Sequence, residues 1–179
     1  MWLTILDKPN VNEYDIHQVL WCFFQEHQKQ GLERPFCYRV TDNEIIMLSN
    51  VKPSTECTKI ELVEGNTYLF ECRASVKRTY KDENGKSRWR EDYKGDELKE
   101  WFKRRFGDAA TINFVTYKTF APHVIVRAKT QNRMVFSQYV FQGSLTVTNS
   151  ESLEQMLGKG IGQGCAFGFG AVLLPQVMK

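Results

Sequence analysis

The chain has 179 residues, with 24 Lys and Arg against 21 Asp and Glu, for a formal net charge of +3. Its hydrophobic share of 42% and aromatic share of 13% are sufficient for a packed core, which excludes a disordered or fibrous chain. The longest apolar run, Val19 to Phe24, is far too short to span a bilayer, and no signal peptide opens the chain. We therefore expect a cytoplasmic protein with no membrane partner.

The first half of the chain predicts strands and helices in the order βαββαβ, which is the ferredoxin-like pattern. The expected elements are a strand at Trp2 to Leu6, a helix from Glu13 to Gln30 ended by Gly31, a hairpin of Phe36 to Val40 and Glu44 to Leu48 that turns at Asp42-Asn43, a short element between Pro53 and Ile60, and a strand from Tyr68 to Val76.

The first helix carries two side-chain stripes that helical periodicity separates by roughly 120°. The apolar stripe, which is expected to pack on a sheet, contains Ile16, Val19, Leu20, Phe23 and His27. The second stripe contains Tyr14, His17 and Trp21. His17 is therefore expected off the core and beside a phenol, although periodicity alone favours a structural or surface role for such a histidine.

The middle of the chain is its basic part, because Arg73 to Arg105 holds twelve Lys or Arg against seven Asp or Glu. Asn84-Gly85 predicts a hairpin turn flanked by cations and by Tyr80 and Trp89. Cations interleaved with aromatic rings suit a nucleic-acid backbone, although an ordinary solvated hairpin fits the same pattern. The candidate contacts are Lys77, Arg78, Lys81, Lys86, Arg88 and Arg90.

The second half repeats the pattern of the first. It predicts a helix from Asp96 to Phe106, strands at Thr111 to Phe120 and Met134 to Val147, a helix at Ser150 with Thr148 and Glu151 at capping-box spacing and Gly158 as its stop, and a final strand. His123 is expected in a loop without a partner. We expect an α+β protein of two tandem ferredoxin-like (RRM-like) domains, residues 1–80 and 81–179.

The segment from Gly158 to Gly170 holds six of the twelve glycines of the chain. Phosphate loops of the Walker and dinucleotide types precede a helix, whereas this segment follows a helix and leads into an expected strand containing Phe167 and Phe169. A mononucleotide fold is therefore excluded. The backbone N–H groups of Gly160, Gly162 and Gly164, next to Lys159, are suited to a phosphodiester chain, and a turn without a ligand is the alternative.

The five cysteines, Cys22, Cys37, Cys57, Cys72 and Cys165, are odd in number and scattered. The sequence has no Cys-x-x-Cys pair and no histidine at ligand spacing. We therefore expect free thiols, no metal site and no cofactor.

Three motifs in order, Tyr14-Asp-Ile-His-Gln-Val-Leu-Trp21, Tyr68-Leu-Phe-Glu-Cys-Arg-Ala74 and Gly160 to Gly170, resemble the CasE family of CRISPR repeat-processing endoribonucleases. This family is the type I-E branch of the RAMP superfamily. The resemblance implies cleavage of a CRISPR repeat hairpin RNA on the 3′ side of its stem base. It also implies that the enzyme stays bound to the crRNA 3′ stem-loop as a subunit of the Cascade complex, meeting target DNA only through that complex.

The resemblance further implies that His17 is catalytic, with Tyr14 as its companion. Because the sequence has no carboxylate cluster for a two-metal site, we expect the RNA 2′-hydroxyl to attack, leaving a 2′,3′-cyclic phosphate and a 5′-hydroxyl. An imidazole can donate the proton that the leaving oxygen needs, whereas a phenol is a poor base at neutral pH. We therefore expect His17 to act as acid, Tyr14 to position the substrate, and Lys159 to face the phosphate.

The sequence departs from the family at Cys165, where members commonly carry Lys or Arg. Either Lys159 or a basic residue from elsewhere, such as Arg34 or Lys118, then supplies the charge, or cleavage is slow. Two other functions also fit the sequence. One is a non-catalytic RNA-binding subunit of a CRISPR or other ribonucleoprotein complex. The other is an unrelated RRM-like protein that exposes aromatic rings on its central strands, for which the candidates are Tyr68, Phe70, Phe136 and Tyr139.

Overall fold

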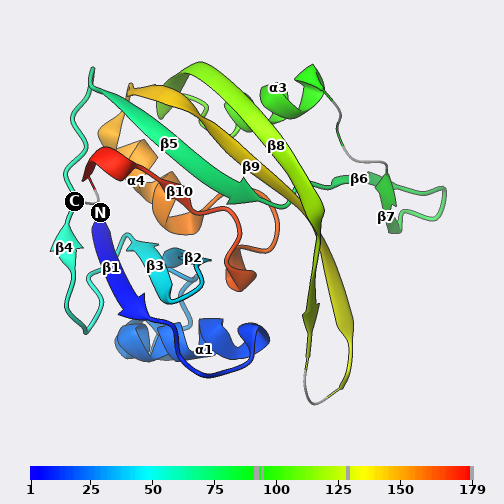
Figure 1. Ribbon diagram of the computed structural model, residues 1–179, viewed down its shortest axis with the longest axis horizontal. Helices are drawn as coiled ribbons and strands as arrows, with labels where there is room; N and C mark the ends of the chain where they lie inside the picture. Colours follow the sequence, from blue (N-terminus) through cyan, green and yellow to red (C-terminus); the bar gives the residue numbers. More distant parts are fainter. Residues whose placement is uncertain (91–92, 94, 128–129, 178–179) are drawn as a thin grey trace.

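The computed structural model describes residues 1–90, 93, 95–127 and 130–177, without the side chains at 78–81, 87–90 and 177. It contains two four-stranded antiparallel sheets and a separate two-stranded hairpin (Figure 1). In the described part of the chain, no helix combines the length and the apolar character needed to cross a membrane.

The first sheet has the strand order β2-β3-β1-β4, which is the ferredoxin-like order. Its strands are β1 (Trp2–Asp7), β2 (Phe36–Val40), β3 (Glu44–Ser49) and β4 (Thr58–Lys59). The hairpin of β2 and β3 is confirmed, with Val40 opposite Ile45. The short element expected between Pro53 and Ile60 is β4, the edge strand beside β1.

The helical segment before β2 is broken, contrary to the single helix expected from residue 13 to residue 30. It consists of η1 (Glu13–Asp15), α1 (Ile16–Trp21), η2 (Cys22–Phe24) and α2 (Gln25–Lys29). The interruption comes at Phe24, whose φ of −131° and ψ of 37° lie outside the helical region. This distortion turns the Phe24 ring into the core, where it is 3% exposed and stacks on Phe36.

The second sheet has the order β10-β5-β9-β8, which repeats the ferredoxin-like arrangement. Its strands are β5 (Thr67–Ala74), β8 (Ala110–Val126), β9 (Arg133–Val147) and β10 (Val172–Leu173), and its helices are α3 (Asp96–Arg104) and α4 (Ser150–Lys159). The protein is therefore an α+β protein of two ferredoxin-like domains, as expected.

One strand was assigned to the wrong domain by the sequence pattern. β5, which was expected to close the first domain, pairs along its whole length with β9 and opens the pattern of the second. The fourth strand of the first sheet is instead β4, whose two residues give no alternating signal. By sheet pairing, the chain passes to the second domain between Lys59 and Thr67, ahead of the boundary expected at residue 80.

The glycine-rich segment also differs from the expected strand. Residues Cys165–Phe167 form a 3-10 turn, η3, bounded by the left-handed residues Gly164 and Gly168. β10 is only two residues long, because the positive φ angles at Gly168 and Gly170 keep the chain before it from extending. A last turn, η4 (Pro175–Val177), follows β10.

The ends of α4 differ from the expected ones. Its N-cap is Asn149, whose side chain accepts from the Ser152 N–H, so Thr148 does not cap the helix. The helix also continues past Gly158 to Lys159, and Gly160 follows it with a φ of +76°.

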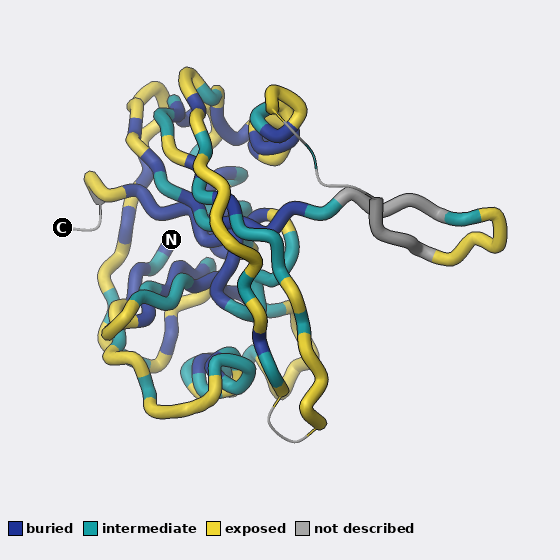
Figure 2. The backbone as a smooth tube through the Cα atoms, turned by 45° about the vertical axis from the view of Figure 1, so that its right-hand side comes forward, coloured by how far each residue is buried: buried dark blue, intermediate teal, exposed yellow. Residues whose placement is uncertain are grey.

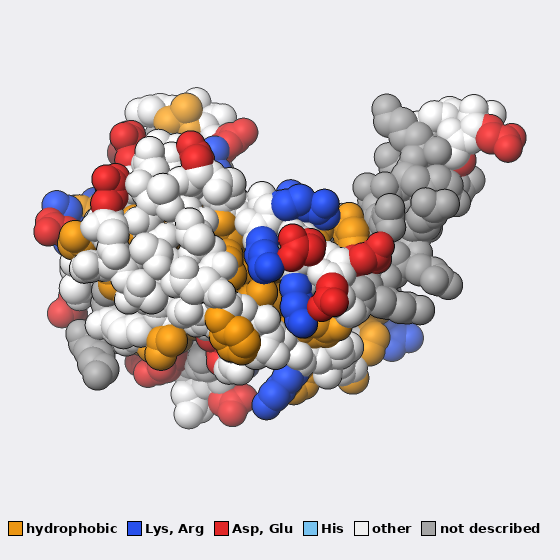
Figure 3. All heavy atoms as spheres, turned by 90° about the horizontal axis from the view of Figure 1, so that it is seen from above, with side chains coloured by type: hydrophobic (Ala, Val, Ile, Leu, Met, Phe, Trp, Pro, Cys, Tyr) orange, Lys and Arg blue, Asp and Glu red, His pale blue; other side chains and the backbone are white. Residues whose placement is uncertain are grey.

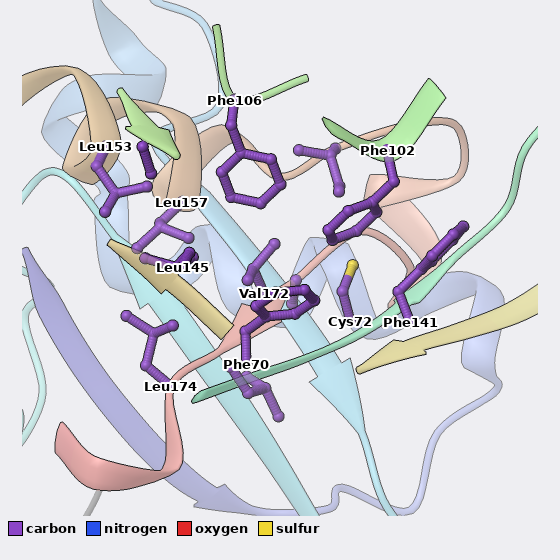
Figure 4. Packing of buried hydrophobic residues seen from close by; sticks show 14 of the residues in the cluster. Phe70, Cys72, Phe102, Phe106, Phe141, Leu145, Leu153, Leu157, Val172 and Leu174 are labelled. Carbon is purple, nitrogen blue, oxygen red and sulfur yellow. The ribbon is translucent and has the colours of Figure 1, made fainter. Parts of the chain in front are cut away.

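The main core joins both sheets to α3 and α4 (Figure 4). Phe102 of α3 stacks on Phe141 of β9 and Phe70 of β5, with ring centroids 4.4 and 5.2 Å away. Truncating such a buried ring to Ala typically costs about 3–5 kcal/mol. Tyr68, Phe70 and Tyr139 are at most 8% exposed, so these three rings are not available to stack on RNA as the RRM-like alternative requires.

Two hairpins extend from the second sheet (Figure 1). The strands β6 (Arg78–Lys81) and β7 (Ser87–Arg90) form the basic hairpin expected around Asn84-Gly85, and it points away from both sheets. The far ends of β8 and β9 pass beside the first helical segment in both tube and ribbon views (Figures 1 and 2). β8 reaches Val126 because a bulge between Phe120 and His123 accommodates Pro122, which cannot donate a ladder hydrogen bond.

Candidate active site

Tyr14 and His17 lie at the start of the first helical segment, on the stripe that faces away from the core. The Asn12 side chain accepts from the Tyr14 N–H at 2.9 Å, which starts the segment at η1. Ile16 and Leu20 are fully buried and fix the rotation of α1, leaving Tyr14 and His17 partly exposed. The expected placement of His17 off the core and beside Tyr14 is therefore confirmed.

The histidine ring is held by its own helix. His17 Nδ1 lies 2.9 Å from the carbonyl oxygen of Tyr14. Because a carbonyl oxygen can only accept, Nδ1 must carry a proton, and Nε2 is the nitrogen that gains or loses one. The ring is thus oriented for proton transfer through Nε2.

The glycine-rich segment completes the site from the second domain. The Phe167 ring of η3 lies 5.7 Å from the ring of Tyr14 and 6.0 Å from the ring of His17, between centroids. The Tyr14 and His17 rings are 6.1 Å apart and nearly perpendicular. The structure therefore brings together the two motifs that the sequence singled out, with an aromatic ring at the contact.

The glycine segment is tied to its surroundings by its own backbone. The N–H groups of Gly160, Ile161 and Gln163 donate to the carbonyls of Met156, Gly170 and Ser75. The N–H groups of Gly162 and Gly164 donate to no protein acceptor within the described residues. Of the three glycines expected to offer a bare N–H group, Gly160 is therefore already bonded, and Gly162 and Gly164 stay candidates for phosphate contact.

Close packing requires glycine at position 162. Its φ is +79°, and a Cβ there would lie 2.8 Å from the Ser75 carbonyl oxygen and 3.2 Å from the Trp101 ring. Tyr38 holds the same loop from β2, because its hydroxyl donates to the Ala166 carbonyl at 2.6 Å. Burial raises the pKa of Tyr38, so the phenol keeps this proton.

Cys165 occupies the position where members of the CasE family commonly carry Lys or Arg, and it lies against a second thiol. A Cβ at Gly160 would be 2.4 Å from Cys37 Sγ and 3.2 Å from Cys165 Sγ, so the two sulfurs face each other beneath the loop. A hydrogen bond from Cys37 and the nearby Arg34 guanidinium lower the pKa of Cys165 to about 7, against the effect of burial. Of the alternative cations considered for this position, Arg34 is therefore the one the structure places beside Cys165.

Lys159 lies at the end of α4, and its ammonium group is 3.7 Å from a carboxylate oxygen of Glu33. Glu33 is in the loop after α2, and its backbone carbonyl contacts the His27 ring. The contact that the structure gives Lys159 is therefore with this loop, and its role at the phosphate stays a prediction.

The structure describes the side chains of two of the six basic residues that are expected to bind RNA. Lys77 donates to the Val135 carbonyl at 2.8 Å and so points back to β9, whereas Lys86 is exposed at the hairpin turn. The side chains of Arg78, Lys81, Arg88 and Arg90 lie outside the described residues.

Sequence reasoning missed the contribution of β8 to this site. His123 was expected in a loop without a partner, but it lies in β8, and its Nε2 is 2.8 Å from a carboxylate oxygen of Glu13. Farther along, the Arg127 guanidinium lies over the Tyr14 ring, 5.2 Å from its centroid. The β-branched run Val124-Ile125-Val126 was the signal for a continuing strand, but nothing in it indicated the partner on η1.

The described cysteines are free thiols, as expected. In that part of the chain, no three His, Cys, Asp or Glu side chains gather as metal ligands.

A sequence model of the family described as CRISPR associated protein matches residues 6–175. The chain belongs to this family. The resemblance to the CasE family that the motifs predicted is confirmed by this match and by similarity to solved structures. No curated protein sequence matches the chain.

Solved structures of CRISPR proteins share its fold over nearly the whole chain. Cas6e from Escherichia coli K-12 has a TM-score of 0.74 and 21% identity, covering 97% of this chain and 98% of that one. Thermus thermophilus Cse3, bound to an RNA representing a pre-cleavage complex, has a TM-score of 0.71 and 18% identity, covering 97% and 98%. A chain in E. coli Cascade bound to a PAM-containing double-stranded DNA target has a TM-score of 0.60 and 21% identity, with the same coverage.

Proposed function

We propose that this member of the CRISPR-associated family is a metal-independent endoribonuclease that cleaves CRISPR precursor RNA within its hairpin repeat. The observation that carries the proposal is the meeting of His17 and Tyr14 with the glycine segment at Phe167. Phosphodiester cleavage by an internal nucleophile requires a ring nitrogen free for proton transfer and hydrogen-bond donors for the phosphate, and Gly162 and Gly164 carry N–H groups without a protein acceptor among the described residues. The names of the similar structures, a CRISPR endoribonuclease bound to RNA among them, support it.

In the proposed reaction, the 2′-hydroxyl at the cleavage site gives up its proton to the surrounding water and attacks the adjacent phosphate. The bond to the 5′ oxygen of the next nucleotide breaks, and protonated His17 gives its Nε2 proton to that oxygen. The products are a 2′,3′-cyclic phosphate and a 5′-hydroxyl. Tyr14 positions the reacting phosphate, and Lys159 with the N–H groups of Gly162 and Gly164 would stabilise its charge.

We further propose that the enzyme stays bound to the crRNA 3′ stem-loop as a Cascade subunit in the cytoplasm. Similarity to a chain of E. coli Cascade and to chains of CRISPR RNA-guided surveillance complexes supports this assembly. Other Cascade subunits would then be its protein partners, and target DNA would be reached only through the complex.

Incubating the protein with a hairpin repeat RNA in excess EDTA, followed by analysis of both product ends, tests the reaction. A cyclic phosphate on one fragment and a 5′-hydroxyl on the other are expected. Loss of cutting on chelation, restored by magnesium, would overturn the mechanism. Tight binding of intact RNA without cleavage would instead favour the non-catalytic RNA-binding subunit.

A further inference from the structure

The proposed reaction concentrates negative charge on a phosphate beside Tyr14 and His17, and a cation there would stabilise the transition state. Two cations near the contact between the two domains already have anionic partners. Lys159 lies 3.7 Å from Glu33, and Arg39 forms an ion pair with Glu71. Arg127 differs from them, because within the described residues its guanidinium has no carboxylate partner.

Arg127 is held at the site by the second domain. It directly follows β8, and its backbone N–H donates to the Asn132 carbonyl at 3.0 Å, which closes that end of the β8–β9 hairpin. Four residues earlier in the chain, His123 contacts Glu13 at 2.8 Å, which joins β8 to η1. These two connections fix the backbone of Arg127 relative to the residues that precede α1.

The geometry of its contact leaves the hydrogen-bonding capacity of Arg127 available. Its guanidinium carbon lies over the Tyr14 ring, 5.2 Å from the centroid. A stacked guanidinium uses its face for the ring, while its N–H groups lie in its own plane and can still reach an acceptor. Two such N–H groups match the spacing of two phosphate oxygens.

We propose that Arg127 is a catalytic residue that binds the reacting phosphate and stabilises its charge, with the Tyr14 ring as the platform that orients it. This inference rests on the proposed function and assigns an additional residue to the same site. It also gives Tyr14 a second role, because the ring face, separately from the hydroxyl, would hold the cation near His17, whose ring lies 6.1 Å from that of Tyr14.

The test compares Arg127→Ala, Arg127→Lys and Arg133→Ala by single-turnover cleavage at saturating protein and by RNA affinity. Arg133 is the matched control, since it is exposed, carries the same charge and lies on β9 opposite Val126. Arg127→Ala is expected to slow cleavage by about 10²- to 10³-fold while weakening binding less than about tenfold. Arg127→Lys should recover part of the rate, because it keeps the positive charge but loses the paired N–H groups of the guanidinium. Arg133→Ala should cut within about twofold of wild type.

Sulfur substitution distinguishes phosphate binding by Arg127 from a purely structural role through Tyr14. Two RNAs are compared, in each of which one of the two non-bridging oxygens of the reacting phosphate is replaced by sulfur, a weaker hydrogen-bond acceptor. Wild type should cut one phosphorothioate isomer much more slowly than the other, and Arg127→Ala should lose that preference. An unchanged preference, wild-type cutting by Arg127→Ala, or an equal rate loss in Arg133→Ala would each overturn the inference. Failure of the wild type to cut any repeat RNA would instead refute the proposed function.

Discussion

The Nδ1 atom of His17 lies 2.9 Å from the Tyr14 carbonyl oxygen, so the helix itself sets the tautomer of the ring. The hydrogen bond directs the proton to Nδ1 in the neutral ring and leaves Nε2 to carry the proton used in chemistry. No second side chain is needed to orient the imidazole. The same contact explains why Tyr14 and His17 are three residues apart, because that spacing places a helical carbonyl below the ring.

His17→Ala should therefore slow cleavage by about 10²- to 10⁴-fold, the usual cost of a missing general acid, and leave RNA affinity within a few fold. His27→Ala is the matched control from the same helical segment, since its ring hydrogen-bonds the Glu33 carbonyl. Normal cleavage by His17→Ala would refute the assignment. Unfolding of His17→Ala, seen as a lost thermal transition, would show that the residue is structural.

A repeat RNA with a single 2′-deoxy substitution at the cleavage site should bind nearly as tightly as the native RNA and remain uncut. The change removes the nucleophile but at most one hydrogen bond, a loss of about 1 kcal/mol. The same substitution one nucleotide away should be cut normally, which controls for altered binding. Cleavage of the first RNA at the same position would mean that water attacks.

The basic hairpin should contribute to affinity through phosphate contacts. Replacing Lys86, Arg88 and Arg90 with Ala is expected to weaken RNA binding and to lower the log-log salt slope by roughly two units. The control replaces Lys99 and Lys103 of α3 and Arg105, its C-cap; the two lysines are paired with Asp96 and Glu100. Figure 3 shows such mixed charges side by side on the upper face. If both triple variants bind alike, the RNA does not follow the hairpin.

Gly162→Ala should destabilise the protein by roughly 1–3 kcal/mol in urea unfolding, because it combines a left-handed φ with a contact to the Ser75 carbonyl. Gly85→Ala is the control, since Gly85 has a similar φ of +73° but no atom within 4 Å of the added Cβ. The stability of Gly85→Ala should fall only by the amount that the strained backbone costs. Equal losses in the two variants would contradict the close packing of the glycine segment.

Cys165 should make stability depend on pH. Its folded-state pKa of about 7 lies below the ordinary thiol value, so the folded state binds fewer protons than the unfolded state in this range. The stabilisation is present at higher pH and is lost as the pH falls through about 7. Between about pH 6 and about pH 8, the free energy of unfolding of wild type should rise relative to that of Cys165→Ser. Parallel curves would place the thiol pKa at its ordinary value.

Cys37 does not contribute to this pH dependence between about pH 6 and about pH 8, a range that lies below the ordinary thiol pKa. Cys37, whose pKa is raised by its hydrogen bond to Cys165 and by burial, stays protonated on both sides of the unfolding equilibrium there. At higher pH it would act in the opposite direction, because an unfolded Cys37 would ionise while the folded one would not.

The sequence by itself determined the local features that depend on neighbouring residues. Periodicity placed Ile16 and Leu20 in the core and His17 beside Tyr14, since side-chain direction along a helix follows from its turn. Asn84-Gly85 located the basic hairpin because few other dipeptides adopt that turn.

Only the tertiary structure decided the features that depend on distant segments. β5 joined the second sheet because pairing with β9 is set by long-range register, and the helical segment before β2 is interrupted at Phe24, whose ring packs on Phe36. The contacts of Glu13 with His123 and of Tyr14 with Arg127 likewise depend on where the end of β8 packs against η1, which no local pattern encodes.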